Sequence, residues 1–187
     1  LLSKSYLTGR QTQIQHDRIV TTPAEPGGPF MFTRQWADDD SDHGLSTTHM
    51  SIVDADGMVV SMTTSIENAF GSRLFVKGFL LNNQLTDFSF VPEQDGLAVA
   101  NRVAAGKRPR SSMSPTIVLE NQQPIIAIGS PGGSRIINYV AKTMLGVLEW
   151  DLDIQAAIDM PHFVNRNGAT DLEDNTAISQ LKPQLEA

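Results

Sequence analysis

A strand–turn–strand pattern between residues 48 and 66 constrains the fold more than any other part of the sequence. Residues 48–53 are rich in β-forming side chains, and residues 54–57 have the composition of a tight turn. Residues 58–66 then alternate, which places on one strand face Met58, Val60, Met62, Thr64 and Ile66. The pattern predicts an antiparallel hairpin.

A second strand–turn–strand pattern lies further along the chain. Residues 116–119 and 124–128 flank a polar turn at residues 120–123. After a Pro-Gly-Gly break, apolar residues recur at helical spacing from about Ser134. Asp153 is a good N-cap for a short helix that ends before Pro161, and Pro183 weakens a further helix from residue 176. Hairpins followed by helices predict an α+β fold, with helices packed on a mixed sheet.

The first 46 residues have a different texture. Residues 1–22 predict a short helix and an extension, whereas prolines and glycines exclude regular structure from residue 23 onward. We interpret residues 23–46 as an exposed linker and its acidic run, from Asp38 to His43, as a solvated loop. A metal site in that run is the alternative. The change to β-forming residues at Thr47 divides the chain into residues 1–46 and 47–187.

Composition excludes several classes of protein. A content of 40% hydrophobic and 19% charged residues is typical of a globular chain. The net charge of −7 argues against nucleic acid or an anionic membrane as the main partner, and no apolar run reaches the length of a membrane span. The absence of cysteine excludes disulfides, thiolate zinc sites and a cysteine nucleophile. We expect truncation at both ends, because the chain lacks an initiator methionine and stops without a helix C-cap.

Thr47 stands where the linker meets the first strand. A threonine hydroxyl is a poor nucleophile without a base, but the α-amine of an N-terminal threonine, with a pKa of about 7.7–8.0, can take its proton. Cleavage before Thr47 would create that amine. The alternative is an ordinary threonine at the start of a strand, where β-branched residues are favoured.

Three further segments carry groups suited to a ligand. Gly132 and Gly133, between a strand and a helix, could present N–H groups to an oxyanion. A tight turn is the alternative, and the ending of a phosphate-binding loop is absent. Residues 107–116 combine hydroxyls with basic groups, which suits a carboxylate, and residues 81–88 carry amides and a carboxylate that could hold an ammonium. A charged loop and a polar turn are the respective alternatives.

These segments occur together in one order and spacing. The chain carries in sequence Thr47-Thr48-His49, Leu80-Leu81-Asn82-Asn83-Gln84 with Asp87-Phe88-Ser89, Lys107-Arg108-Pro109 with Ser111-Ser112-Met113-Ser114-Pro115-Thr116, and Gly129-Ser130-Pro131-Gly132-Gly133-Ser134-Arg135. The set closely resembles the small subunit of gamma-glutamyltransferases, also called glutathione hydrolases, from about Thr47 to the end. Residues 1–46 resemble the tail of the large subunit with a flexible linker, and residues 47–187 resemble a C-terminally truncated small, catalytic subunit.

The resemblance implies a fold and a reaction. The family is made as one proenzyme, folds as a four-layer αββα N-terminal-nucleophile hydrolase, which would be incomplete here, and cuts itself into two subunits. The cut would fall between Ser46 and Thr47. The new N-terminal threonine attacks a gamma-glutamyl amide such as that of glutathione, and water or an amine acceptor resolves the acyl-enzyme. No cofactor or metal is implied, and the large subunit of the same precursor is the expected partner.

The resemblance also assigns roles to matching positions. It makes Thr47 the nucleophile and gives the oxyanion hole to Gly132 and Gly133. The substrate α-carboxylate is matched to Ser111 and Ser112, and the substrate α-amine to Gln84 and Asp87.

Two positions depart from the family pattern. Ser65 replaces a threonine that supports the nucleophile, and it keeps the hydroxyl but loses a methyl group. Glu67 replaces an asparagine that contacts the substrate amine. A carboxylate can still bind an ammonium, but Glu67 leaves the acyl group open.

Three functions are therefore weighed. The first is a gamma-glutamyl hydrolase or transpeptidase, and the second is an acylase that cleaves the glutaryl side chain of a cephalosporin, a substrate without the α-amine. The third is a non-catalytic fragment or degenerate homologue. The chain by itself is expected to be inactive, because the large subunit supplies an arginine and part of the sandwich. Family habit favours a periplasmic or extracellular location, with a cytoplasmic one as the alternative.

Overall fold

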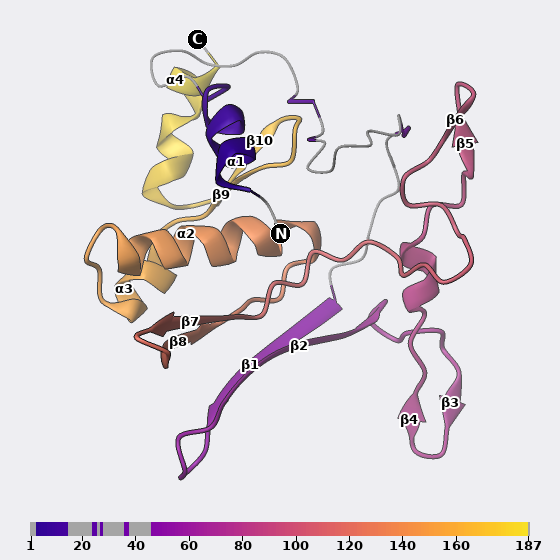
Figure 1. The fold of residues 1–187 in the computed structure, drawn as a ribbon, viewed down its shortest axis with the longest axis horizontal. Coiled ribbons are helices and arrows are strands. Elements are labelled where there is room, and N and C mark those ends of the chain that lie inside the picture. Colours follow the sequence, from indigo (N-terminus) through magenta and orange to yellow (C-terminus); the bar gives the residue numbers. More distant parts are fainter. Residues whose placement is uncertain (1–2, 15–23, 26, 28–35, 38–45, 187) are drawn as a thin grey trace.

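The computed structural model describes residues 3–14, 24–25, 27, 36–37 and 46–186 (Figure 1). The helices are α1 (Lys4–Gln11), α2 (Ile136–Leu148), α3 (Ile154–Asp159) and α4 (Lys182–Leu185), with 3-10 turns η1 (Gln84–Asp87), η2 (Gly133–Arg135) and η3 (Ala177–Leu181). The strands are β1 (Ser46–Val53), β2 (Val59–Glu67), β3 (Phe75–Val76), β4 (Phe79–Leu80), β5 (Glu93–Gln94), β6 (Leu97–Ala98), β7 (Thr116–Glu120), β8 (Gln123–Ile128), β9 (Phe163–Asn165) and β10 (Thr170–Leu172).

Both predicted hairpins are present. In the first, β1 pairs antiparallel with β2, and the carboxylate of Asp54 accepts backbone N–H bonds from Asp56 and Met58 to close the turn. In the second, β7 and β8 are joined by only two residues, Asn121 and Gln122, with φ angles of 49° and 67°. The turn is tighter than the predicted four residues because two left-handed residues match the right-handed twist of the strands.

The sheet is divided where the sequence predicted one mixed sheet. The described residues form five two-stranded antiparallel sheets, and the two long hairpins lie against each other without backbone pairing. In the view of Figure 1, α2 runs above β7–β8 and β1–β2 lies below it. The predicted α+β class is therefore confirmed, with an α–β–β order of layers in this view.

The predicted helices are also present. The side chain of Asp153 caps α3 by accepting the backbone N–H of Gln155, and α3 ends at Asp159 as expected. Pro183 lies in the first turn of α4, where its missing N–H has no helical partner to lose, so it starts this helix rather than weakening it. In the described part of the chain the longest helix, α2, has 13 residues, and none of the helices is long and apolar enough to cross a bilayer.

The predicted linker lies mainly outside the described residues, and the acidic run with His43 lies outside them entirely. Ala24 and Ala37 are among the described residues of this region that contact the rest of the chain. Ala24 exchanges two hydrogen bonds with the side chain of Asn167 (2.6 and 3.0 Å). Ala37 forms a parallel bridge with Val99.

The β1–β2 hairpin turns its polar face inward. Along β2 the side chains of Ser61, Thr63 and Ser65 are half-buried, whereas Val60 and Met62, on the apolar face, are 40% and 43% exposed. Further large apolar side chains are exposed among the described residues, including Phe70, Phe75 and Phe90. These exposed apolar faces are suited to contact further protein.

This exposure predicts opposite effects of Met62→Lys in two settings. In a separately expressed segment 47–187 the lysine should raise solubility, because it interrupts an uncovered apolar face. In the full-length product of the gene it should lower the thermal unfolding midpoint by several degrees, because the face is covered there. Solubility assays and thermal scans measure the two effects.

Met58→Lys is the matched control, since Met58 lies in the turn outside β2 and is 67% exposed. It should be close to neutral in both settings. Equal behaviour of the two variants in the full-length product would show that the apolar face stays uncovered.

Candidate active site

Thr47 lies at an irregularity of the hairpin. Its Cα partner on β2 is Ser65, whereas the partner of Ser46 is Glu67, so β2 carries one extra residue, Ile66, at this point. Such bulges redirect side chains and are frequent beside active sites. A pocket of about 340 Å³ opens here and is lined by Thr47, Thr48, Thr64, Ser65, Ile66 and Ala69. The predicted nucleophile and its predicted supporting hydroxyl therefore share one cavity.

Glu67 ends β2 in a left-handed conformation, with φ 69°. Its backbone N–H donates to Ser65 Oγ (2.8 Å), and its carboxylate accepts from Asn83 Nδ2 and from Thr86 Oγ1 (3.5 Å). Asparagine adopts this conformation more readily than glutamate, so the carboxylate is held here against a backbone preference. These contacts join the end of β2 to η1.

The turn η1 brings the two residues matched to the substrate amine together. Gln84 Nε2 donates to Asp87 Oδ2, and Asp87 is 9% exposed. Phe88 caps the turn and is buried, which fixes its position. Since Glu67 accepts from Asn83 and Thr86, the carboxylates of Glu67 and Asp87 both contact side chains of residues 83–86.

A buried asparagine links this turn to the segment that carries Ser111 and Ser112. Asn101 Nδ2 donates to the carbonyl oxygen of Asp87 (2.6 Å), and Asn101 Oδ1 accepts the backbone N–H of Arg110 (2.9 Å). Ser111 Oγ accepts the backbone N–H of Met113 (3.3 Å), which shapes the approach to β7.

The inward face of β1–β2 rests on β8 through hydroxyl groups. Ser51 Oγ donates to the carbonyl oxygen of Ala127 (3.1 Å), and Ser61 Oγ donates to that of Ile128 (3.0 Å). One residue further, the ring of His49 occupies the space that a Cβ on Gly129 would need. As the chain proceeds from Ala127 to Gly129, its contact on β1 shifts from Ser51 to His49, which is nearer to Thr47. The chain after Gly129 therefore continues toward the Thr47 end of the hairpin.

The protonation of His49 follows from these bonds. The single proton of the Ser51 hydroxyl goes to Ala127, so Ser51 Oγ must accept from His49 Nε2 (3.1 Å). His49 Nδ1 then accepts from Thr63 Oγ1 (2.8 Å) in the neutral ring. Burial lowers the pKa of His49 below its usual value of 6.5, in agreement with this neutral form.

Gly132 and Gly133 form the turn into α2. Their φ angles are 135° and 57°, a region that side chains rarely adopt, and a Cβ on Gly132 would lie 2.8 Å from the ring of Tyr139. Glycine is therefore required at Gly132 by both backbone and space. The fold directs this turn toward Thr47, and Ser111 and Ser112 approach the same end because Thr116 pairs with Ile128.

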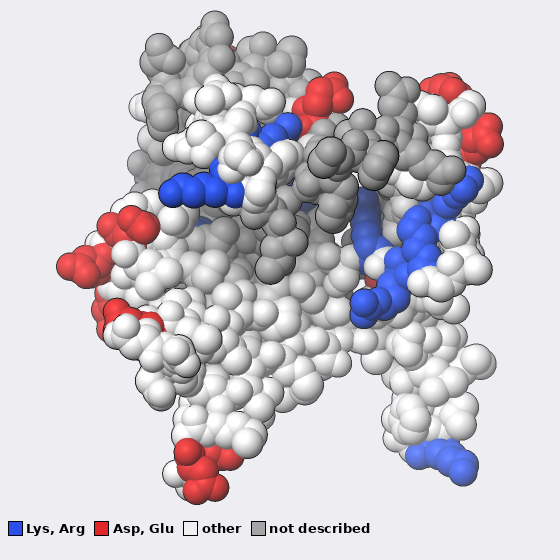
Figure 2. Space-filling model, viewed as in Figure 1, with Lys and Arg blue, Asp and Glu red and all other residues white. Residues whose placement is uncertain are grey.

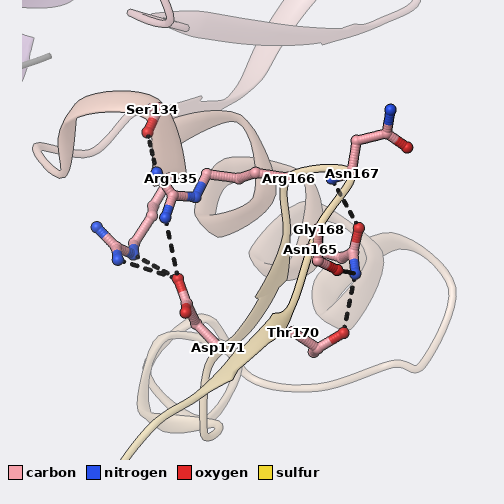
Figure 3. Close-up of polar contacts among 8 residues, drawn as sticks. All are labelled: Ser134, Arg135, Asn165, Arg166, Asn167, Gly168, Thr170 and Asp171. Atoms are coloured by element: carbon pink, nitrogen blue, oxygen red, sulfur yellow. Dashed lines mark hydrogen bonds and ion pairs between the residues drawn. The ribbon is translucent and has the colours of Figure 1, made fainter. Parts of the chain in front are cut away.

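A network of charged side chains contacts the residues that follow the Gly132–Gly133 turn (Figure 3). Asp171 on β10 accepts from Arg135 Nε (3.1 Å) and Nη2 (3.0 Å), and it also forms an ion pair with Arg166 (3.5 Å). Arg166 Nη1 donates to Ser134 Oγ (2.9 Å). The β9–β10 hairpin is thus fastened to the two residues that follow Gly133.

The motifs and this arrangement agree with one family. The gamma-glutamyltranspeptidase family matches residues 1–187, the whole chain.

The chain belongs to the gamma-glutamyltranspeptidase family.

Relatives in this family are glutathione hydrolase proenzymes. The chain is 38% identical over 170 residues to that of Bacillus subtilis and 42% identical over 171 residues to that of a Pseudomonas species, matches that cover 86% and 87% of the chain. Each match covers 28% of the relative, so the chain spans little more than a quarter of these proteins.

Solved structures show the same fold. A Helicobacter pylori gamma-glutamyltranspeptidase mutant is 36% identical with a TM-score of 0.62, and the match covers 74% of this chain and 81% of that one. A cephalosporin acylase from Bacillus halodurans is 26% identical with a TM-score of 0.74, covering 98% of this chain and 30% of that one. The chain therefore has part of the N-terminal-nucleophile hydrolase fold that this gamma-glutamyltranspeptidase family shares with the acylase.

The surface of this family member is uneven in charge although the net charge is −7. Figure 2 shows basic side chains gathered at the right of the view, over the region between β6 and β7. That segment carries Arg102, Lys107, Arg108 and Arg110. The basic group therefore lies on the segment that leads to Ser111 and Ser112.

Sequence reasoning missed the residues that hold the site together. His49, Ser51, Ser61 and Thr63 alternate on the polar face of the hairpin, a signal hidden by the stronger apolar alternation beside it. Asn101 had no pattern of its own, because its importance depends on two loops that only the fold brings together.

The packing of His49 predicts the effect of Gly129→Ala. The added methyl group overlaps the imidazole ring, so the variant should lose about 1–3 kcal/mol of unfolding free energy and shift the turn before Gly132, which lowers turnover. Urea denaturation of the full-length product measures the loss.

A second variant isolates the cause. In Gly129→Ala combined with His49→Ala the space is vacated, so the double variant should be more stable than the sum of the two single losses predicts. Strict additivity would show that the His49 ring does not limit residue 129.

The lowered pKa of His49 predicts a pH dependence of stability. Its neutral form is favoured by folding, so its contribution is fully present above pH 6.5 and is lost as the pH falls through its folded pKa. His162 contributes with the same sign, since burial and then Lys142 lower its pKa against a raising effect of Glu173. Urea denaturation at pH 7.5 and 5.5 should show a smaller loss in His49→Gln than in the wild type. An equal loss would contradict the neutral assignment.

Proposed function

We propose that this chain carries the nucleophile and the substrate-binding turns of a gamma-glutamyl hydrolase/transpeptidase. The observation that carries the proposal is the position of Thr47. Thr47 lies at a bulge, beside a pocket of about 340 Å³ shared with Ser65, and β2, the strand that carries Ser65, ends in the Glu67–η1 cluster. An ordinary strand-initiating threonine has no need of a bulge, a pocket and an acidic cluster together.

The first proposed step is cleavage of the Ser46–Thr47 peptide bond. Thr47 is internal to the chain as written, and its nitrogen belongs to an amide that is not a base. Cleavage frees an α-amine with an unperturbed pKa of about 7.7–8.0, which can take the proton of the Thr47 hydroxyl. The rate of catalysis should therefore rise as this amine loses its proton.

The second step forms an ester. Thr47 Oγ1 bonds to the γ-carbonyl carbon of the substrate, the carbonyl oxygen gains negative charge, and the N–H groups of Gly132 and Gly133 stabilise it. The amide C–N bond then breaks, and its nitrogen leaves with a proton from the Thr47 amine. Water or an amine acceptor attacks the ester and restores the hydroxyl, while Ser65 supports the nucleophile.

Substrate recognition follows from charge. The carboxylates of Glu67 and Asp87, with the amide of Gln84, suit the α-ammonium of a gamma-glutamyl group. The hydroxyls of Ser111 and Ser112, near the basic segment, suit its α-carboxylate. A ligand that carries both an α-ammonium and an α-carboxylate is complementary to the acidic side chains and to the basic segment.

Further protein is needed for activity under this proposal. The chain spans 28% of the Bacillus subtilis relative, and its apolar faces are exposed. We propose that residues 1–46 end a large subunit and that residues 47–187 begin a small one.

A glutaryl-cleaving acylase is the second candidate. It is favoured by the acylase of Bacillus halodurans, whose structure matches 98% of the chain. The substrate would then lack an ammonium and would bring a carboxylate alone beside Glu67 and Asp87. Because like charges repel at close range, the acidic cluster favours the gamma-glutamyl substrate.

The proposal predicts the products of the full-length gene product. An intact mass spectrum of the wild type should show two polypeptides, the smaller one starting at Thr47. Thr47→Ala should give one uncut chain without activity, because the attacking hydroxyl is missing. Only the wild type should hydrolyse a gamma-glutamyl anilide, and a glutaryl anilide should be a poorer substrate.

Thr8→Ala is the matched control, because Thr8 is exposed on α1 and does not line the pocket, and this variant should still be cut. A single uncut wild-type chain would favour a non-catalytic homologue, since the required amine would never form. Faster cleavage of the glutaryl anilide would favour the acylase.

A further inference from the structure

Asn101 occupies a position between the two predicted substrate-binding turns. It is 6% exposed, and both ends of its side-chain amide are used. Nδ2 donates to the carbonyl oxygen of Asp87 (2.6 Å), and Oδ1 accepts the N–H of Arg110 (2.9 Å). Its own carbonyl oxygen accepts the N–H of Ser89 (3.0 Å). Three hydrogen bonds from one residue therefore tie residues 87–89 to residues 101–110.

The chemistry of this link requires an amide. A donor and an acceptor must lie at fixed separation on one rigid group, because one turn presents a carbonyl and the other an N–H. A carboxylate supplies no donor, and an apolar side chain leaves the buried Asp87 carbonyl and the part-buried Arg110 N–H without this partner. Asn101 is therefore only one step from each predicted subsite. It contacts Asp87, which is matched to the substrate amine, and Arg110, which directly precedes Ser111.

We infer that Asn101 is a positioning residue that sets the separation between the ammonium and carboxylate subsites, and so selects α-amino acids such as L-glutamate over plain dicarboxylates. This inference rests on the proposed function. Asn101 touches no substrate itself; it acts through the Asp87 carbonyl and the Arg110 N–H. The two bonds have separable roles, because the first holds the ammonium side and the second holds the carboxylate side.

Two variants separate these roles. Asn101→Asp keeps the acceptor for Arg110 but loses the donor to Asp87, whereas Asn101→Ala loses both. The added charge of Asn101→Asp would by simple attraction strengthen ammonium binding, so a weaker preference for ammonium in this variant reports position rather than charge.

Calorimetric titration of the processed full-length product with L-glutamate and with glutarate is the experiment. In Asn101→Asp, binding of L-glutamate should weaken about tenfold while binding of glutarate changes little, so that their ratio falls. In Asn101→Ala both should weaken. KM for a gamma-glutamyl anilide should rise in both variants with kcat less affected, since an interaction shared by ground state and transition state is lost.

Asn121→Asp is the control for the chemical change, because Asn121 is exposed in the β7–β8 turn and its left-handed conformation tolerates aspartate. Its ratio of affinities should equal that of the wild type. An unchanged ratio in Asn101→Asp, in a protein that cleaves gamma-glutamyl anilides, would overturn the inference and leave the proposed function intact. A wild type that binds no L-glutamate and cleaves no gamma-glutamyl anilide would overturn both.

Discussion

The packing of the β1–β2 hairpin against β8 is the contact on which the rest of the site depends. It consists of hydroxyl-to-carbonyl hydrogen bonds from Ser51 and Ser61 and of the His49 ring packed on Gly129. Each bond contributes only about 1 kcal/mol, but bonds to backbone atoms fix direction and distance more sharply than apolar packing does. These hydrogen bonds join residues 76 and 67 positions apart in the sequence, so that Thr47 and the glycine turn belong to the same end of the structure.

Local structure could be read from the sequence because it depends on local chemistry. The strand–turn–strand patterns predicted both long hairpins, Asp153 predicted the start of α3, and the paired glycines predicted the turn into α2. The candidate site residues were predicted from the combination of motifs, and the fold then brings Thr47, Ser65, Glu67, Gln84 and Asp87 into one region. Their catalytic roles remain a proposal from the family.

Other features depend on partners that no local pattern reveals. Alternation distinguishes the two faces of β2 but not which of them is covered inside this chain, and the polar one is. The division into two-stranded sheets has the same origin, because strand order is a property of distant segments. Asn101 and the Arg135–Asp171 pair act between loops, so only the three-dimensional arrangement identifies them.

The contacts of Ala24 and Ala37 with the rest of the chain bear on what happens after a cut before Thr47. Ala37 is joined to the β6 region by N–H bonds of 3.0 and 3.1 Å, with Lys107 over the neighbouring Trp36 ring at 5.8 Å, and Ala24 is joined to Asn167. Eight residues lie between Ala37 and Ser46, which limits the reach of a new carboxyl end to about 30 Å. A carboxyl end attached at this distance stays near the pocket, at an effective concentration in the millimolar range. Under the proposed cleavage, a substrate would then have to compete with this attached carboxyl end for the pocket.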